Sequence, residues 1–334
     1  MNTNKIDFLA IGDTVIDAFI KLTDADRVDI RGVSGHEDYK ICLPFADKIP
    51  YEEAYILNAV GNAANAAVSA ARLGLNTGLV SNLGDDQNGK DCLASLEKDG
   101  VNTQFIKINE GIKTNYHYVL WYKTERTILI KHEKYPYILP DIGEPSWIYF
   151  SSISETAYPF HNTIADYLDI HKNIKLAFQP GKNEIKLGKE KLARLYARTE
   201  IFFCNVEEAR TILDMQGADV LKLSASLMEL GPKIVCISDG PNGAYLYQNG
   251  ELWQIPIYPD TAEPVDRTGA GDAFSSTITC ALAQGMPPLE AFTWGPINAM
   301  SVVQYVGAQA GLLPREKIEE LLKNAPKDYK ARKI

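Results

Sequence analysis

A short glycine-rich stretch, DRTGAGDAFSS at residues 266–276, joins small residues to an aspartate and then to a helix-forming run. Gly269, Ala270 and Gly271 carry almost no side chain, so their backbone N–H groups can approach an anion closely at a helix N-terminus. Asp272 stands in the first turn of that helix, where a carboxylate is stabilised as the anion and can accept a proton. An anion hole beside a general base fits transfer of a phosphoryl group to a hydroxyl.

Three other interpretations of this stretch compete with that one. A P-loop requires a lysine that reaches the phosphates, and the stretch has none. A dinucleotide-binding turn follows a strand and has its acidic residue at a strand end, whereas this turn follows a polar loop and Glu290 opens a helix. A purely structural Asp272, which only complements the helix dipole, stays open at this point.

The composition narrows the range of partners. The 334 residues are 46% hydrophobic, and 34 basic against 43 acidic residues give a formal charge of -9, so the overall field repels nucleic acid and anionic membranes. The N-terminus lacks a signal-peptide pattern, and no apolar run approaches the ~18 residues of a membrane span, which predicts a cytoplasmic protein. Five widely spaced cysteines, mostly in apolar runs, indicate reduced core thiols.

Short β-rich runs alternate with amphipathic helical runs along most of the chain. The predicted strands lie at 7–12, 76–84, 146–151, 173–181, 200–205 and 233–240. The predicted helices lie at 62–73, 87–98, 160–171, 206–215, 219–230, 270–284 and 287–305. This order favours an α/β fold with a mostly parallel central sheet and helices on both faces, which binds ligands at the carboxyl ends of its strands.

Two segments interrupt the alternation. Residues 14–58 hold few clear elements, and residues 105–132 are β-branched and aromatic with partial alternation, as in antiparallel strands with one wet face. We interpret both as a small β-sheet lid inserted into the α/β body. Aromatic side chains on this lid also predict a homodimer contact, and a surface excursion without function is the alternative.

Two motifs in order make the chain resemble a known family. DRTGAGDAF is similar to the C-terminal signature of the ribokinase family, also called the phosphofructokinase-B (PfkB) carbohydrate kinases. VGNAANAAVSAARLG at 60–74 and VSNLGDDQNGK at 80–90 resemble its N-terminal signature. Further matches at 11–17, 205–209 and 238–247 extend the likeness over about residues 6–323. The resemblance implies a ribokinase-like three-layer sandwich, residues 1–334 as a single PfkB-type kinase domain with the two lid segments, and ATP-dependent phosphorylation of a sugar hydroxyl.

The resemblance also implies roles for individual residues. Asp17, Gly61, Asn62 and Asn65 would hold the hydroxyls of the acceptor, and their carboxylate, amide and backbone groups suit that task. Taken alone, Asn62 is typical of a helix N-cap. The turn of residues 269–271 would hold the phosphoryl group, and Asp272 would deprotonate the attacking hydroxyl.

The resemblance implies the nucleotide-binding residues in the same way. Asn205 and Glu208 would act near Mg²⁺ and the phosphates, through water. The residues expected to line the phosphates, ribose and base of the nucleotide are Ser238, Gly240, Gly243 and Asn298. Many relatives also bind a monovalent cation, for which Asp266 and Thr268 supply oxygen ligands, although Gly311 stands where a serine ligand would help. K⁺ is therefore an open possibility. Val60 replaces a usual glycine, and Arg267 replaces a common threonine.

The sequence says less about the phosphoryl acceptor than about the phosphoryl-transfer residues. Ribose or another small sugar is favoured, with a nucleoside kinase as the alternative because four lid aromatics could stack on a base: Tyr116, Tyr118, Trp121 and Tyr122. A sugar phosphate would need the lid's basic residues: Lys107, Lys113, Lys123, Arg126 and Lys131. A non-catalytic sugar or nucleotide sensor is the hypothesis from another class.

Overall fold

The computed structural model describes residues 5–23, 26–30, 38–122 and 125–334. Its main sheet has the strand order β16-β15-β14-β13-β12-β11-β10-β1-β6-β7. Strands β13 to β7 in that order run parallel, and β14, β15 and β16 add an antiparallel edge. The strands are β1 (Phe8–Ile11), β6 (Thr77–Gly84), β7 (Ile106–Asn109), β10 (Trp147–Phe150), β11 (Lys175–Phe178), β12 (Thr199–Asn205), β13 (Ile234–Ser238), β14 (Ala244–Gln248), β15 (Glu251–Ile255) and β16 (Arg332–Lys333).

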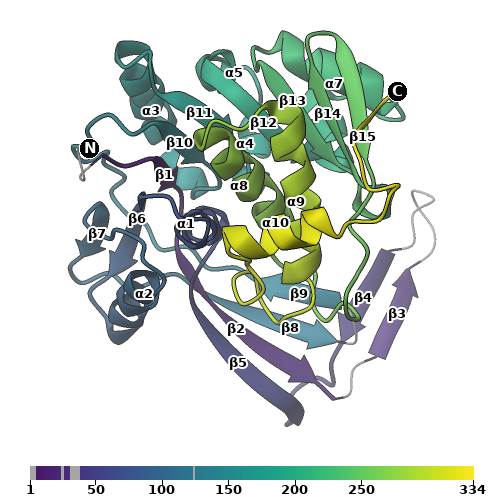
Figure 1. Cartoon of the computed structure of the whole chain (residues 1–334). Coiled ribbons are helices and arrows are strands. Elements are labelled where there is room, and N and C mark those ends of the chain that lie inside the picture. Colours follow the sequence, from purple (N-terminus) through teal and green to yellow (C-terminus); the bar gives the residue numbers. More distant parts are fainter. Residues whose placement is uncertain (1–4, 24–25, 31–37, 123–124) are drawn as a thin grey trace.

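Helices cover both faces of this sheet (Figure 1). One face packs against α1 (Asn62–Arg72), α2 (Gln87–Lys98), α8 (Ala270–Ala283), α9 (Pro288–Val302) and α10 (Arg315–Lys323). The other packs against α3 (Tyr158–Ile170), α4 (Lys182–Leu187), α5 (Ala193–Arg198), α6 (Val206–Leu213) and α7 (Val220–Glu229), with short 3₁₀ turns at Glu155–Ala157 and Gly240–Asn242. Successive residues of β1 enter opposite cores, Phe8 on the first side and Leu9 on the second, because side chains alternate along a strand. The predicted three-layer sandwich is confirmed.

A second sheet projects below the body (Figure 1), and because it is built mainly from the two predicted lid segments we call it the lid. Its strand order is β5-β2-β8-β9, from β2 (Val15–Leu22), β5 (Tyr51–Val60), β8 (Tyr116–Tyr122) and β9 (Glu125–Leu129). Strands β3 (Asp26–Ile30) and β4 (Asp38–Cys42) form a separate antiparallel pair. The predicted lid segment of residues 105–132 starts too early, because residues 106–109 form β7 and pair in parallel with β6 of the main sheet.

The register of the lid separates its two faces. Asp17 pairs with Leu57 on one side and with His117 on the other, so these three side chains share the inner face, which also carries Arg126. Ala18 pairs with Ile56 and Tyr118, and Tyr118 pairs with Leu129, so this row lies on the outer face. Leu57 lies against Gly307 of the body, which shows that the inner face is turned toward the body.

Helix α8 is the element that carries the glycine-rich turn into the interior. Its residues from Asp272 to Ala281 are all buried, and most of them are small. Gly295 of α9 allows close approach, because a Cβ there would meet Phe274 at 2.7 Å and Ile278 at 2.8 Å. On its other side α8 packs against α1, so two stretches about 200 residues apart in the chain meet.

Among the described residues, no helix combines the length and the apolar character needed to cross a bilayer.

Candidate active site

The polar ends of the parallel strands meet along one edge of the main sheet. Asp13 follows β1, Gln179 follows β11, and Asn205 and Ser238 are the last residues of β12 and β13. Parallel strands bring their carboxyl ends to the same edge, where open α/β sheets bind ligands. The N-terminus of α8 arrives at this edge and completes the candidate site.

Three side-chain amides hold the carboxylate of Asp272. Asn62 donates from Nδ2 to Oδ1 over 3.0 Å, Asn65 donates from Nδ2 to Oδ2 over 2.8 Å, and Gln179 donates from Nε2 to Oδ1 over 3.2 Å. Asn62 is the first residue of α1, and its N-cap is Gly61, so the alternative of Asn62 as a cap is wrong. The structure thus joins Asp272 directly to two residues that the sequence assigned to acceptor binding.

Further contacts fix which way two of these amides point. Oε1 of Gln179 accepts from the hydroxyls of Tyr149 and Ser275, which leaves Nε2 to face Asp272. Oδ1 of Asn65 accepts from Nε2 of Gln309 over 3.0 Å, which leaves Nδ2 to face Asp272. Each amide therefore presents a donor, and a carboxylate that accepts several such bonds is oriented and favoured as the anion.

Burial opposes that effect. Asp272 is 9% exposed, and loss of hydration raises the pKa of its carboxyl above the usual range, although the bonds from Asn65, Gln179 and Asn62 each lower it. The sequence predicts a carboxylate stabilised as the anion by the helix N-terminus, and burial works against that stabilisation. The raised pKa makes the carboxylate a stronger proton acceptor than an exposed aspartate.

The turn before Asp272 has the geometry of an anion hole. Gly269 is the N-cap of α8 with φ of 81°, a left-handed conformation that glycine adopts at little cost. A Cβ at this position would come within 2.3 Å of the Ala308 side chain in the loop after α9. The closeness of this loop is therefore a second reason for glycine at position 269. At Gly271 a Cβ would have Nε2 of Gln179, at 3.8 Å, as its nearest neighbour, which leaves the backbone open to a ligand. The first N–H groups of a helix have no acceptor within it.

A cavity of about 440 Å³ adjoins this turn, within the range of small-ligand sites. Ala270 and Gly271 belong to its wall, as does Arg267. Three predicted nucleotide residues line it: Ser238, Gly240 and Gly243. The remaining wall is mostly apolar and includes Ile257, Tyr258, Phe274, Pro296, Ala299, Met300 and Val303.

Asn298 does not line this cavity. Its side chain is fully buried, its Nδ2 donates to the Thr277 hydroxyl over 2.7 Å, and its Oδ1 accepts from the backbone of Leu313 over 2.9 Å. Asn298 was predicted to lie near the base, and in the structure its polar atoms tie α9 to α8 and to the following loop. Gly243 has a structural role as well, because a Cβ there would lie 2.0 Å from the carbonyl oxygen of Ile255.

Asn205 and Glu208 form a capping box at the start of α6. Oδ1 of Asn205 accepts from the backbone of Glu208 over 2.8 Å, and Oε2 of Glu208 accepts from the backbone of Asn205 over 2.9 Å. Burial raises the pKa of Glu208, and the charge of Asp272 raises it further. Glu208 therefore lies close enough to Asp272 to feel its charge. Within the described residues, no three His, Cys, Asp or Glu side chains gather as a metal-binding group.

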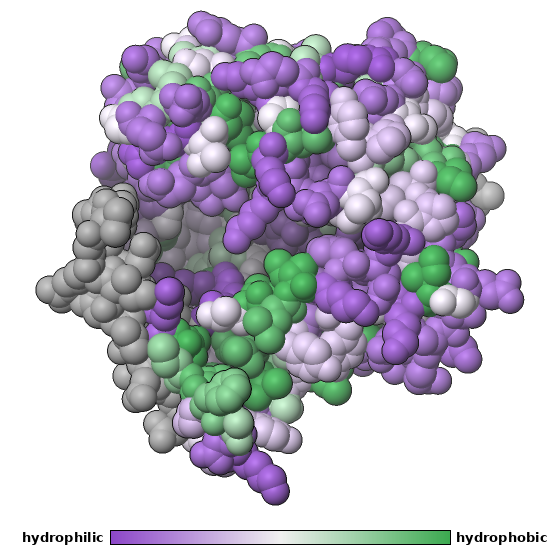
Figure 2. All heavy atoms as spheres, turned by 180° about the vertical axis from the view of Figure 1, so that it is seen from behind, coloured by the Kyte–Doolittle hydropathy of each residue, from purple (hydrophilic) through white to green (hydrophobic). Residues whose placement is uncertain are grey.

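The inner face of the lid brings two more polar groups to the site. Nδ1 of His117 lies 3.4 Å from Oδ1 of Asp17, and both side chains are nearly buried. Oδ1 of Asp17 and Nε2 of His117 are buried without a hydrogen-bond partner among the described residues. Seen from behind, the molecule is hollowed between the body and the projecting sheet (Figure 2). Gly61 stands at the base of the lid, where a Cβ would meet the Asp13 carbonyl oxygen at 2.6 Å.

Sequence reasoning missed Gln179, His117 and Gln309 as site residues. Gln179 had a signal, since it is a polar residue directly after a buried strand and before a proline. His117 and Gln309 had no such signal. The place of His117 depends on strand register, and that of Gln309 on a contact with Asn65, 244 positions away in the sequence.

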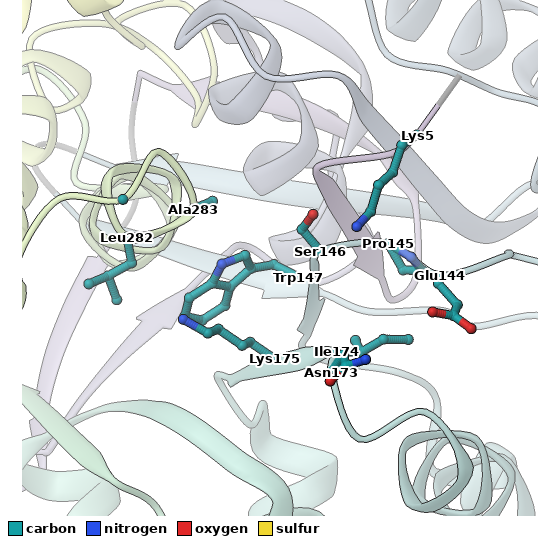
Figure 3. Close-up of a pocket in the computed structure, with 11 residues that line it drawn as sticks. Lys5, Glu144, Pro145, Ser146, Trp147, Asn173, Ile174, Lys175, Leu282 and Ala283 are labelled. Atoms are coloured by element: carbon teal, nitrogen blue, oxygen red, sulfur yellow. The ribbon is translucent and has the colours of Figure 1, made fainter. Parts of the chain in front are cut away.

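A second cavity, of about 310 Å³, lies at the opposite end of the parallel strands (Figure 3). It is lined by residues that begin β10 and β11 and by the C-terminal end of α8. The ammonium of Lys175 lies 5.2 Å from the ring centre of Trp147. This cavity is separate from the glycine-rich turn, because the turn opens at the other end of α8.

Comparison with known proteins agrees with this geometry. Residues 36–315 match the family model described as pfkB family carbohydrate kinase. The chain is 26% identical to the ribokinase of Bacillus subtilis over 268 residues, which are 78% of this chain and 87% of that protein.

Two solved structures are similar in fold. Arabidopsis thaliana ribokinase complexed with ribose and ATP gives a TM-score of 0.77 at 21% identity, over 96% of this chain and 99% of that one. A nucleoside kinase of Methanocaldococcus jannaschii, an archaeal member of the ribokinase family, gives 0.73 at 19% identity, again over 96% and 99%. The fold is ribokinase-like.

Proposed function

Because the chain belongs to the pfkB family of carbohydrate kinases, we propose that it transfers the γ-phosphoryl group of ATP to a hydroxyl of a small sugar, with ribose the favoured acceptor. The observation that carries the proposal is the carboxylate of Asp272, held by amides of Asn62, Asn65 and Gln179 next to an open helix N-terminus. A structural aspartate that only complements a helix dipole needs no such set of donors.

The chemistry follows from this arrangement. Asp272 accepts the proton of the acceptor hydroxyl as its oxygen attacks the phosphorus. The N–H groups of residues 269–272 stabilise the charge that gathers on the transferring phosphoryl oxygens. Bound Mg²⁺ would neutralise charge on the ATP phosphates. Glu208, a carboxylate near Asp272, would contact this Mg²⁺ through water. Its capping-box bond uses only one lone pair of Oε2, so the carboxylate can still accept hydrogen bonds from such a water.

The acceptor pocket is supported by unpaired polar groups on the lid. Buried polar atoms without partners are costly, so Oδ1 of Asp17 and Nε2 of His117 call for a ligand that can donate and accept hydrogen bonds. A sugar with neighbouring hydroxyls supplies both. The family resemblance assigns Asn62, together with Asp17, to acceptor binding, and Asn62 donates a hydrogen bond to Asp272. A hydroxyl held by Asn62 would therefore meet the proposed base.

The alternation of β8 favours a sugar over a nucleoside. Tyr116, Tyr118 and Tyr122 lie on the outer face of the lid, while His117 and Trp121 lie on the inner face. Three of the four aromatic residues that could stack on a base thus belong to the side away from Asp17. A nucleoside acceptor remains the alternative, with Trp121 as the stacking residue, and Trp121 already packs against Tyr55 and Lys21.

A sugar phosphate has less support from the lid's basic residues. Arg126 is paired with Asp266 at 2.7 Å, and Lys131 is paired with Glu133 at 2.7 Å. Lys107 belongs to β7 of the main sheet, and Lys123 lies outside the described residues. The remaining candidate, Lys113, is exposed, as expected for a solvated side chain.

We also propose a homodimer through the outer face of the lid. Ile56 is 63% exposed, Tyr118 49% and Leu129 52%, and the register puts them in one row across four strands, with Ala18 of β2 between Ile56 and Tyr118. Hydrophobic residues gather on the lower part of the molecule, where the lid projects (Figure 2). A continuous apolar face of this kind is typical of a contact between subunits.

The function is tested by ADP release from Mg-ATP over a panel of ribose, fructose, 2-keto-3-deoxygluconate, fructose 6-phosphate, adenosine and cytidine. The proposal expects turnover with ribose or another small sugar. Turnover with adenosine or cytidine alone would establish the nucleoside alternative. ATP binding without turnover on any acceptor would favour the non-catalytic sensor and contradict the proposal.

A further inference from the structure

The carboxylate of Asp266, predicted as a ligand for K⁺, accepts hydrogen bonds from four protein donors. Oδ1 accepts from Nη1 of Arg126 at 2.7 Å, from the backbone of Thr268 at 2.9 Å and from its hydroxyl at 2.6 Å. Oδ2 accepts from the backbone of Gly307 at 2.9 Å. A carboxylate has about four lone-pair sites. Three donors saturate Oδ1, and Oδ2 already accepts one bond, so a cation at this carboxylate would have to displace protein donors.

The charge of Asp266 is also already balanced. Its side chain is 5% exposed, and a buried carboxylate without a positive partner is costly. Arg126 is that partner, and it comes from β9 of the lid, 140 positions away in the sequence. The guanidinium is always charged and offers several donors in a fixed plane. The residues therefore do not fit a monovalent cation bound at Asp266.

Asp266 stands directly before the anion hole. Through Thr268 it holds the residue that precedes Gly269, and through Gly307 it holds the loop whose Ala308 packs against Gly269. The position of the turn thus depends on the same carboxylate that Arg126 neutralises. The contact of Arg126 with this carboxylate therefore links the lid, which is proposed to hold the acceptor, to the proposed phosphoryl site.

We propose that Arg126 takes the place of a monovalent cation beside the anion hole, so that this kinase needs no K⁺ and its turn is positioned from the lid. Arg126 is a positioning residue, since it acts through Asp266 and not by contact with either substrate. The catalytic part rests on the proposed function, whereas the replacement of the cation can be tested on the protein alone.

The test compares wild type, Arg126→Ala and Arg126→Lys, with Thr127→Ala as a control at an exposed position of the same strand. Thermal unfolding of each protein without substrates is measured in KCl, NaCl and tetramethylammonium chloride at equal ionic strength. Initial rates with ATP and the identified acceptor are measured in the same salts, with and without millimolar guanidinium chloride.

We expect wild type and Thr127→Ala to unfold at the same temperature in KCl and in tetramethylammonium chloride, and to show no activation by K⁺. In Arg126→Ala the rate should fall roughly 10- to 100-fold, as for a displaced catalytic turn. K⁺ or guanidinium should restore part of it, and K⁺ should raise the unfolding temperature in a saturable way. Arg126→Lys should retain more activity than Arg126→Ala.

Saturable stabilisation of the wild type by K⁺ over the other two salts would overturn the proposal, because a cation would then bind beside Arg126. A full rate in Arg126→Ala would overturn it as well, as would a lost rate that neither cation restores in a normally folded variant. If no acceptor is turned over, the unfolding data still decide whether Arg126 excludes K⁺, so failure of the proposed function is recognised separately.

Discussion

Asn65 and Asp272 are 207 positions apart in the chain, and the amide of the first donates to the carboxylate of the second over 2.8 Å. The bond joins α1 to α8 where the two helices pack together. Asn65 is itself oriented by Gln309, and Gln309 also donates to the Ala59 carbonyl oxygen. The proposed base is thus held from the N-terminal and C-terminal halves of the chain at once.

Removal of the amide of Gln179 is expected to alter the pH dependence of turnover. The base works when it is ionised, so kcat should fall as the pH drops through the pKa of Asp272. Gln179→Met removes a donor that lowers this pKa. The acidic limb of the kcat profile should therefore move to higher pH. Gln87→Met, at an exposed position, is the control. An unchanged limb, or a shift to lower pH, would contradict the assignment.

A methyl group at Gly269 is expected to disrupt the anion hole beyond its effect on the backbone. Gly269 and Gly285 both have positive φ, 81° and 87°, so alanine costs roughly 1–2 kcal/mol at either position. Only at Gly269 does the new Cβ meet Ala308, which adds about 1–3 kcal/mol. Thermal unfolding and turnover of Gly269→Ala and Gly285→Ala measure the difference. Equal losses in both variants would argue against the close contact.

A single reactive thiol is expected in the native protein. Cys42 is exposed, whereas the other four cysteines are buried. Burial raises the pKa of Cys92 to about 12 and those of Cys204, Cys236 and Cys280 as well, so little thiolate forms at neutral pH. Titration with a chromogenic disulfide should detect one thiol, and Cys42→Ser should remove it. A second thiol that reacts before unfolding would show that the core is more open than described.

A charge on the outer face of the lid is expected to dissociate the dimer. Tyr118→Lys introduces an ammonium into the apolar row, and its desolvation would oppose association. Ile170→Lys, at the last residue of α3, is the matched control, because Ile170 is 76% exposed. Sedimentation at micromolar concentration should show wild type and the control as dimers and Tyr118→Lys as the 37.0 kDa monomer. A monomeric wild type would refute the proposed homodimer.

Most of the body could be predicted from periodicity. The helix at Gln87–Lys98 has the predicted bounds, and the predicted helix at 270–284 ends one residue earlier. Helices α4 and α5 were missed because each has only six residues, too few for a repeat of 3.6 to be recognised. Strand β7 was assigned to the wrong sheet, since alternation along a strand does not identify its neighbour.

The candidate site was predictable where a local motif carries it. The turn of residues 269–271 and Asp272 could be identified because glycine, small size and a helix start are all local features. The full set of partners around Asp272 could not be predicted in this way, since Gln179 contacts Asp272 and Gln309 contacts Asn65 only through tertiary packing. Asn298 matched a family pattern, yet its polar atoms are used inside the core.

The most direct test of the central claim is turnover by Asp272→Asn, measured beside ATP binding. If Asp272 is the general base, kcat should fall by ~10² or more while the Kd for ATP stays near the wild-type value, because the asparagine cannot accept the proton. Asp328→Asn, at an exposed position, should retain full activity. A variant of Asp272 that keeps its turnover, or that loses ATP binding together with it, would contradict the account.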